Sequence, residues 1–119
     1  MPSMPIWLPL KPGQTEAARA FAAECIGPRY AEYDASERRI GIHAENWYLQ
    51  HTPAGDTFVI VIEGQDLNGS VAAFVASQDP FDVWFKRRML ELTGVDFSAV
   101  PPEMIGETLA EYKVGATRG

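Results

Sequence analysis

The stretch at residues 57–63, TFVIVIE, is apolar at five consecutive positions and constrains the fold more than any other feature of the chain. Side chains of a strand alternate between its two faces, so this run places valines on one face and phenylalanine and isoleucines on the other. A strand that is apolar on both faces must be covered on both faces. The chain therefore needs helices on one side of its sheet and a second cover on the other.

Three further segments have the composition of strands. Residues 42–50 alternate, and the turn 52–56 (TPAGD) joins them to 57–63, which predicts an antiparallel hairpin. Residues 4–10 are apolar and carry two prolines, which is typical of an edge strand. Residues 107–114 alternate in part and predict a last strand.

Helix signals separate these strands. Thr15 is a suitable N-cap, and the apolar residues that come after it recur at helical spacing. Gly27 and Pro28 interrupt this helix, and a kinked or restarted segment is expected to run to about residue 39. Asp66 and Asp79 are predicted to cap two later helices.

The predicted order is β-α-β-β-α-α-β, an α+β fold with a four-stranded antiparallel sheet. This is a ferredoxin-like arrangement with one extra helix before the last strand. Residues 1–119 are expected to form one domain, with a frayed tail at about 115–119. Helices would cover only one face of the sheet, so a second copy packed sheet to sheet is expected to cover the other. The expected partner is this copy, in a homodimer.

Charge and composition exclude several classes of protein. The 119 residues contain 10 Lys plus Arg and 16 Asp plus Glu, a formal charge of −6, which disfavours nucleic-acid binding. No apolar run approaches the ~20 residues of a membrane span. Cys25 is the one cysteine, so no disulfide forms within the chain. The first residues lack a signal sequence, which leads us to expect a cytoplasmic protein.

Three stretches resemble a known superfamily: residues 10–15 (LKPGQT), 45–49 (ENWYL) and 77–82 (SQDPFD). They are similar to an uncharacterised bacterial family of the dimeric α+β barrel superfamily, which is related to antibiotic-biosynthesis-type monooxygenases. The resemblance implies a dimeric α+β barrel whose pocket lies between sheet and helices. It also implies a cofactor-independent monooxygenase, cyclase or isomerase acting on a small aromatic or carbonyl metabolite.

His43 and Glu45 are the candidate catalytic residues. Together with Trp47 they alternate along the strand at 42–50 and are expected to share one face. A histidine beside a carboxylate can transfer protons, and a carboxylate under helices needs a partner or has a raised pKa. We expect His43 and Glu45 to face the helices and form the polar floor of a pocket. The alternative is a solvated histidine beside an ion-paired glutamate.

Aromatic and basic residues complete the candidate site. Trp47, Tyr33 and Trp84 are candidates for substrate binding, and Arg88 is expected to reach Glu45 or a bound carboxylate. Core packing is the alternative for the aromatic residues. Asp79 and Asp82 flank a Pro-Phe pair and could form an acid pair, but helix capping explains both without chemistry. The sequence has no metal-binding or nucleotide-binding motif, so neither a metal nor a cofactor is expected.

Two functions remain open from the sequence. The first is a small cofactor-independent enzyme, and the second is a non-catalytic dimeric protein that binds a small molecule or assists another protein. An open cavity above His43 and Glu45 would favour the enzyme. A cavity filled by Trp47, Trp84 and Tyr33 would favour the second function.

Overall fold

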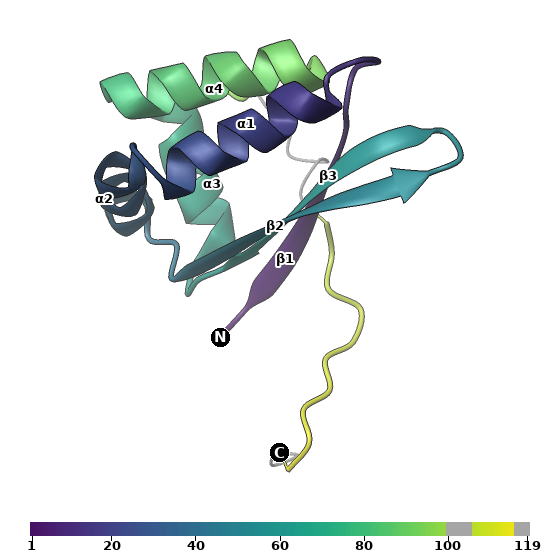
Figure 1. Cartoon of the computed structure of the whole chain (residues 1–119). Coiled ribbons are helices and arrows are strands. Elements are labelled where there is room, and N and C mark those ends of the chain that lie inside the picture. Colours follow the sequence, from purple (N-terminus) through teal and green to yellow (C-terminus); the bar gives the residue numbers. More distant parts are fainter. Residues whose placement is uncertain (100–105, 116–119) are drawn as a thin grey trace.

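The computed structural model describes residues 1–99 and 106–115. Within these residues, seven elements succeed one another in the order β-α-α-β-β-α-α (Figure 1). Their bounds are β1 Ser3–Pro9, α1 Thr15–Ile26, α2 Tyr30–Ile40, β2 Ala44–Thr52, β3 Gly55–Glu63, α3 Leu67–Ala76 and α4 Pro80–Thr93.

The three strands form one antiparallel sheet in the order β1-β3-β2. Strand β3, which is apolar on both faces, lies in the middle of the sheet, as its composition requires, and pairs with a strand on each edge. Phe58, Ile60 and Ile62 point toward the helices and are buried. β1, with its two prolines, is an edge strand as predicted, because it pairs with β3 alone among the described residues.

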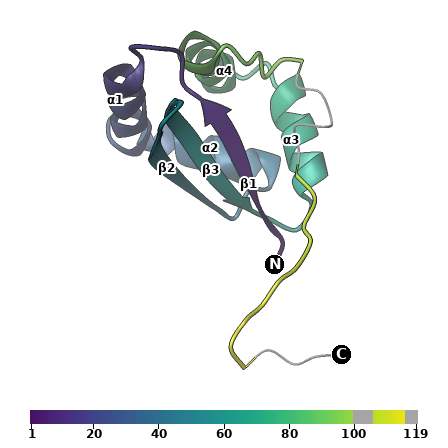
Figure 2. The ribbon, with the colours of Figure 1, turned by 90° about the vertical axis from the view of Figure 1, so that its right-hand side faces the viewer.

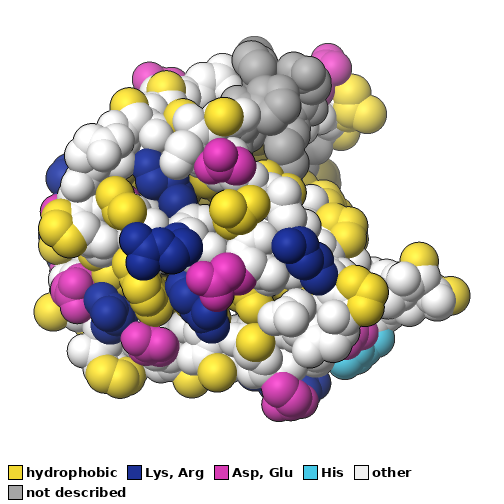
Figure 3. All heavy atoms as spheres, turned by 90° about the horizontal axis from the view of Figure 1, so that it is seen from above, with side chains coloured by type: hydrophobic (Ala, Val, Ile, Leu, Met, Phe, Trp, Pro, Cys, Tyr) yellow, Lys and Arg dark blue, Asp and Glu magenta, His cyan; other side chains and the backbone are white. Residues whose placement is uncertain are grey.

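All four helices lie on the same side of the sheet (Figures 1 and 2). Between the helices and the sheet, buried side chains from every helix and from β1 and β3 form one core. Its largest fully buried apolar members are Phe21, Leu8, Met89 and Leu92. The outer surface of α1 and α4 mixes basic and acidic side chains with apolar ones (Figure 3), including the ion pairs Arg19–Glu16 and Arg88–Glu91.

Glycine and aspartate define the ends of the helices near the candidate site. Gly41 adopts φ +85° and ends α2, so the chain turns directly into β2. Asp79 caps α4 as predicted, since its side chain accepts from Phe81 N at 3.0 Å, and Pro80 occupies the first turn. Asp66 caps α3 by accepting from Gly69 N at 2.9 Å, also as predicted.

The opposite face of the sheet carries exposed aromatic side chains. Trp7 and Tyr48 both lie opposite Val59 in the strand register, one on each side of it. They are 54% and 56% exposed, whereas Val59 between them is buried. No described helix covers this face, so the second cover required by β3 is not supplied by the described part of the chain (Figure 2).

Two sequence predictions differ from the structure. Residues 107–114 were expected to form a fourth strand, but the described residues 106–115 contain none, and Leu109 and Tyr112 are almost fully exposed. The alternation there has no neighbouring strand to pair with, so the four-stranded ferredoxin-like order is not confirmed. The tail prediction falls mostly on residues 116–119, which lie outside the described residues.

No helix in residues 1–99 and 106–115 is long and apolar enough to cross a membrane.

Candidate functional site

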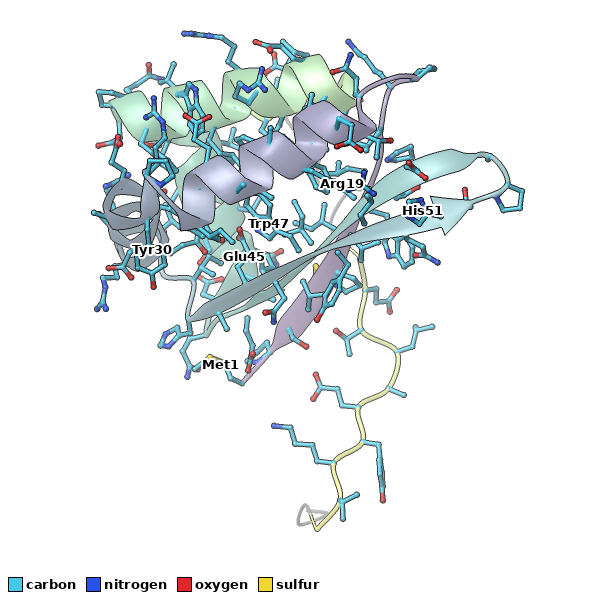
Figure 4. The ribbon with its side chains drawn as sticks, in the orientation of Figure 1. Met1, Arg19, Tyr30, Glu45, Trp47 and His51 are labelled. Carbon is cyan, nitrogen blue, oxygen red and sulfur yellow. The ribbon has the colours of Figure 1, made fainter. Side chains whose placement is uncertain are left out.

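Glu45 lies in the layer between the sheet and the helices, on the helix-facing side of β2. Figure 4 shows its side chain next to that of Trp47, below α1. Its Oε1 atom accepts hydrogen bonds from the Tyr33 hydroxyl at 2.7 Å and from Trp47 Nε1 at 2.6 Å. One carboxylate oxygen is therefore held by two donors, and the carboxyl group has a fixed position under the helices.

A second carboxyl group, that of Glu37, meets Glu45 from α2. Glu37 lies one helical turn after Tyr33, so both side chains point to the same side of α2. Its Oε2 atom is buried, and among the described residues it is the one such side-chain atom without a hydrogen-bond partner. Two carboxyl groups in contact can hydrogen bond only when one of them keeps its proton.

The environment indicates which group keeps the proton. Burial raises the pKa of Glu37 to about 9, and the neighbouring charge of Glu45 and a hydrogen bond to it act in the same direction. Burial also raises the pKa of Glu45, but hydrogen bonds from Tyr33, Trp47 and Glu37 favour its charged form. These hydrogen bonds make Glu45 the more acidic of the two groups, so near neutral pH the pair keeps at least one proton, which Glu37 holds and shares with Glu45.

The carboxyl pair separates two hollows. Toward the core lies an apolar cavity of about 80 Å³, and toward the surface lies a groove of about 630 Å³. Tyr33, Glu37 and Glu45 border both hollows. The cavity is otherwise mostly apolar, and its lining includes Ile6, Ile60, Val71, Phe74, Phe85 and Met89. A proton on this pair is thus placed between a dry space and a solvent-facing one.

His43 does not lie on the strand that was predicted to carry it. β2 begins at Ala44, and His43 precedes it in the turn after α2, where its side chain is exposed. Its backbone N–H donates to Glu63 O at 2.7 Å. Of the expected pair, Glu45 faces the helices and His43 does not, although both border the outer groove.

Trp47 and Trp84 pack into an aromatic cluster around Phe21. The ring centroids of both tryptophans lie 5.4 Å from that of Phe21. Trp84 also carries the Arg29 guanidinium over its ring at 4.1 Å. Neither indole lines the cavity, and Trp47 acts on the site through its hydrogen bond to Glu45. Tyr33, the third aromatic candidate, does line it.

Arg88 does not reach Glu45. Its guanidinium forms an ion pair with Glu91 on the same helix at 2.5 Å, on the outer side of α4. It borders neither of the two hollows next to the carboxyl pair.

Asp82 forms a second polar cluster that is structural. It is 0% exposed and accepts hydrogen bonds from Ser36, from Ser77 at 2.5 Å and from Arg39 at 3.0 Å. Burial alone would raise the pKa of Asp82, but these hydrogen bonds lower it. Nearby, buried Lys86 donates to three carbonyl oxygens at the end of α3. Both side chains tie α2, α3 and α4 together, so neither is available to a ligand.

The cysteine and the possible metal-ligating side chains of the described residues do not form a second site. Cys25 is buried, and burial raises the pKa of its thiol to about 12, so it is unreactive near neutral pH. Within residues 1–99 and 106–115 there is no group of three His, Cys, Asp or Glu residues that could hold a metal ion.

Sequence reasoning missed Glu37. The available signal was its spacing of four residues from Tyr33, which puts a carboxylate on the face of α2 that also carries an aromatic residue. That spacing does not reveal that Glu45 lies opposite, because the contact joins two elements whose relative position depends on the whole fold.

Comparisons with known proteins add no identification. No protein-family model matches the chain, and no match is found among curated proteins or among solved structures. Any functional assignment therefore depends on the geometry of the carboxyl pair.

Proposed function

We propose that the protein is a cofactor-independent enzyme of the isomerase type, which moves a proton on a small carbonyl metabolite. The observation that supports it is the carboxyl pair of Glu37 and Glu45, which lies between an apolar cavity and an open groove and whose pKa values are both raised. Proton transfer next to a carbonyl group needs a base and an acid side by side. The pair supplies both at neutral pH.

In this proposal Glu45, as the carboxylate, removes the proton from the carbon next to the carbonyl group. The electron pair of that C–H bond becomes the carbon–carbon double bond of an enol, and Glu37 donates its proton to the carbonyl oxygen. The enol is neutral, and the total charge of the pair is unchanged. Return of a proton from Glu45 to carbon, with the enol proton going back to Glu37, restores the pair.

Tyr33 and Trp47 act as positioning residues in this scheme. Their hydrogen bonds occupy Oε1 of Glu45, which fixes the carboxyl plane and leaves the second oxygen for Glu37 and the ligand. The apolar lining of the cavity keeps water away, which strengthens electrostatic interactions with the reacting groups. The groove on the other side gives the pair access to solvent protons.

Hydrogen exchange into small ketones tests this function without knowledge of the natural substrate. We expect the protein in heavy water to speed deuterium incorporation next to the carbonyl group, monitored by proton NMR. Glu45→Gln should lower the rate by at least about a hundredfold, the low end of what a positioned base contributes. Glu32→Gln, on the exposed side of α2, is the matched control and should leave the rate unchanged.

Two results would overturn the proposal. One is an exchange rate no higher than that of buffer for every ketone tested. The other is an equal rate for the wild-type protein and for folded Glu45→Gln.

The second candidate is a protein that binds a small molecule without changing it. Its support is the small size of the cavity, about 80 Å³, together with the packing of Trp47 and Trp84 on Phe21 in the core, where neither indole is open to a substrate in the cavity. Binding of a ketone that survives in Glu45→Gln, without any exchange in the wild type, would favour this candidate.

We also propose that two copies pack their sheets face to face, as in a dimeric α+β barrel. The support is the uncovered face of the sheet, where Trp7 and Tyr48 are more than half exposed on either side of Val59. The free edge of β1 leaves room for the fourth strand of a ferredoxin-like sheet. Such a dimer would give β3 the cover that its second apolar face requires.

A further inference from the structure

We propose that the cavity beside Glu37 and Glu45 takes the short alkyl end of a neutral aliphatic carbonyl compound, whose carbonyl oxygen accepts a hydrogen bond from Glu37. This inference rests on the proposed function, because it names the ligand class of the same pair. It narrows the class of aromatic or carbonyl metabolites to small aliphatic ones. The volume of the cavity, the polarity of its lining and the charge beside it each support this ligand class.

The volume of the cavity limits the ligand. At about 80 Å³ it is close to half the size of an apolar cavity of roughly 150 Å³ that binds benzene. An aromatic ring therefore does not fit without displacing the lining, whereas a branched group of three carbons does. On the side of α3 and α4 the cavity is closed by buried Met89 and by Phe74 and Phe85, which pack against the core and against each other, so this wall leaves little room to expand.

The lining selects an apolar group. Three strand residues from β1 and β3 form the floor, namely Ile6, Ile60 and Ile62, and side chains of α3 and α4 form the opposite wall. The hydroxyl groups of Tyr33 and Ser36, which also border the cavity, already donate to Glu45 and to Asp82. An apolar cavity of this kind gains little from a water molecule and binds an alkyl group well.

Glu37, with the Ser70 hydroxyl beside it in the lining, is left to recognise a polar atom. Its buried Oε2 has no hydrogen-bond partner among the described residues, and when a ligand binds, the one proton of its carboxyl group can turn from Glu45 to that ligand. A donor next to an apolar cavity suits an acceptor that has no proton of its own, such as the oxygen of a ketone or an aldehyde. A ligand whose alkyl group is bound in the cavity would place its carbonyl oxygen next to Glu37.

Charge excludes an anionic ligand here. No Lys, Arg or His is found among the described residues that line the cavity, while Glu45, the more acidic group of the pair, is the first of the two to take a negative charge. A carboxylate of the same size would face this charge without a cation to balance it. The ligand must therefore be neutral.

A series of probe ligands on the wild-type protein tests the inference. Methyl isopropyl ketone, acetophenone and isobutyrate are titrated into labelled protein, and binding is detected by the indole N–H signal of Trp47 in nitrogen–proton NMR spectra. We expect the aliphatic ketone to bind at least about tenfold more tightly than acetophenone, the effect of a misfit in an apolar pocket. Isobutyrate, which has a similar shape and a negative charge, should not bind.

A pair of variants tests whether the cavity sets this size limit. Val71→Ala removes two methyl groups from the lining on α3 and should tighten the binding of acetophenone relative to that of the aliphatic ketone. Val83→Ala removes the same atoms from α4, away from the cavity, and should leave the ratio of the two binding affinities unchanged. Equal or tighter binding of acetophenone by the wild type would overturn the inference, as would binding of isobutyrate or no binding of any probe.

The two proposals fail in different ways. Binding in the expected size order with no deuterium exchange would leave the ligand class standing and reject the acid–base function. Exchange into ketones without any preference for the small aliphatic one would keep the function and reject this ligand class.

Discussion

Replacing Glu37 by Gln should remove a pH dependence from the stability of the protein. Burial raises the pKa of Glu37 from 4.5 to about 9 in the folded state, and the facing carboxylates of Glu45 and Asp82 add to the shift. Above a pH of about 4.5 the unfolded chain releases a proton that the folded protein keeps. The free energy of unfolding therefore falls as pH rises between these two values, and it is highest on the acidic side.

The size of this effect is set by the number of protons involved. One proton held by the folded state and not by the unfolded state changes the free energy of unfolding by about 1.4 kcal/mol for each pH unit. From about pH 6 to about pH 8 the loss is about 3 kcal/mol. Domains of this size are stable by only about 5–15 kcal/mol, so the change is a large part of the total.

Urea unfolding at a series of pH values measures this slope. Tryptophan fluorescence reports it, because Trp47 packs against the core. The other titratable groups are present in both proteins, so their contributions cancel in the difference between wild type and Glu37→Gln. Glu32→Gln on the exposed side of α2 serves as the control and should keep the wild-type slope. Identical slopes for wild type and Glu37→Gln would show that Glu37 does not keep its proton in the folded protein.

Other parts of the structure give three more predictions. Asp82→Ala should lower the free energy of unfolding by about 3 kcal/mol in urea unfolding, because it leaves two serine hydroxyls without an acceptor and breaks the ion pair with the partly exposed Arg39; a loss below that of Asp79→Ala would contradict this. Asp79→Ala should cost about 1 kcal/mol in the same assay, the usual effect of losing an N-cap, and an unchanged midpoint would show that the cap contributes nothing. Light scattering should give a dimer for the wild type and a monomer for Trp7→Asp, whereas Tyr30→Asp, equally exposed on α2, should stay dimeric; a wild-type monomer at micromolar concentration would reject the dimer.

Most of the fold could be predicted from local patterns. The period-two and helical patterns located the three strands and four helices to within a few residues, and the capping roles of Asp66 and Asp79 were predicted from residue type and position. These features depend on neighbours along the chain, which a sequence displays directly. The predicted strand at 107–114 is not found in the described residues, because alternation shows that a segment could pair and not that a partner strand is within reach.

The candidate site was only half predictable. Glu45 was identified because a carboxylate in the middle of a covered strand needs a partner, and the structure places Tyr33 and Trp47 as its donors. His43 was expected to be that partner, but β2 begins one residue after it and leaves it in the turn. Glu37 comes from another element, so its contact with Glu45 depends on how α2 lies across the sheet.

The proton that Glu37 and Glu45 share at neutral pH underlies both the proposed function and the proposed ligand class. An NMR titration of the glutamate carboxyl carbons detects this proton at the group that holds it, with Glu37→Gln used to assign the signal. We expect one glutamate that titrates near pH 9 and is missing in the variant. Titration of every glutamate near the ordinary value of about 4.3 would contradict the shared proton.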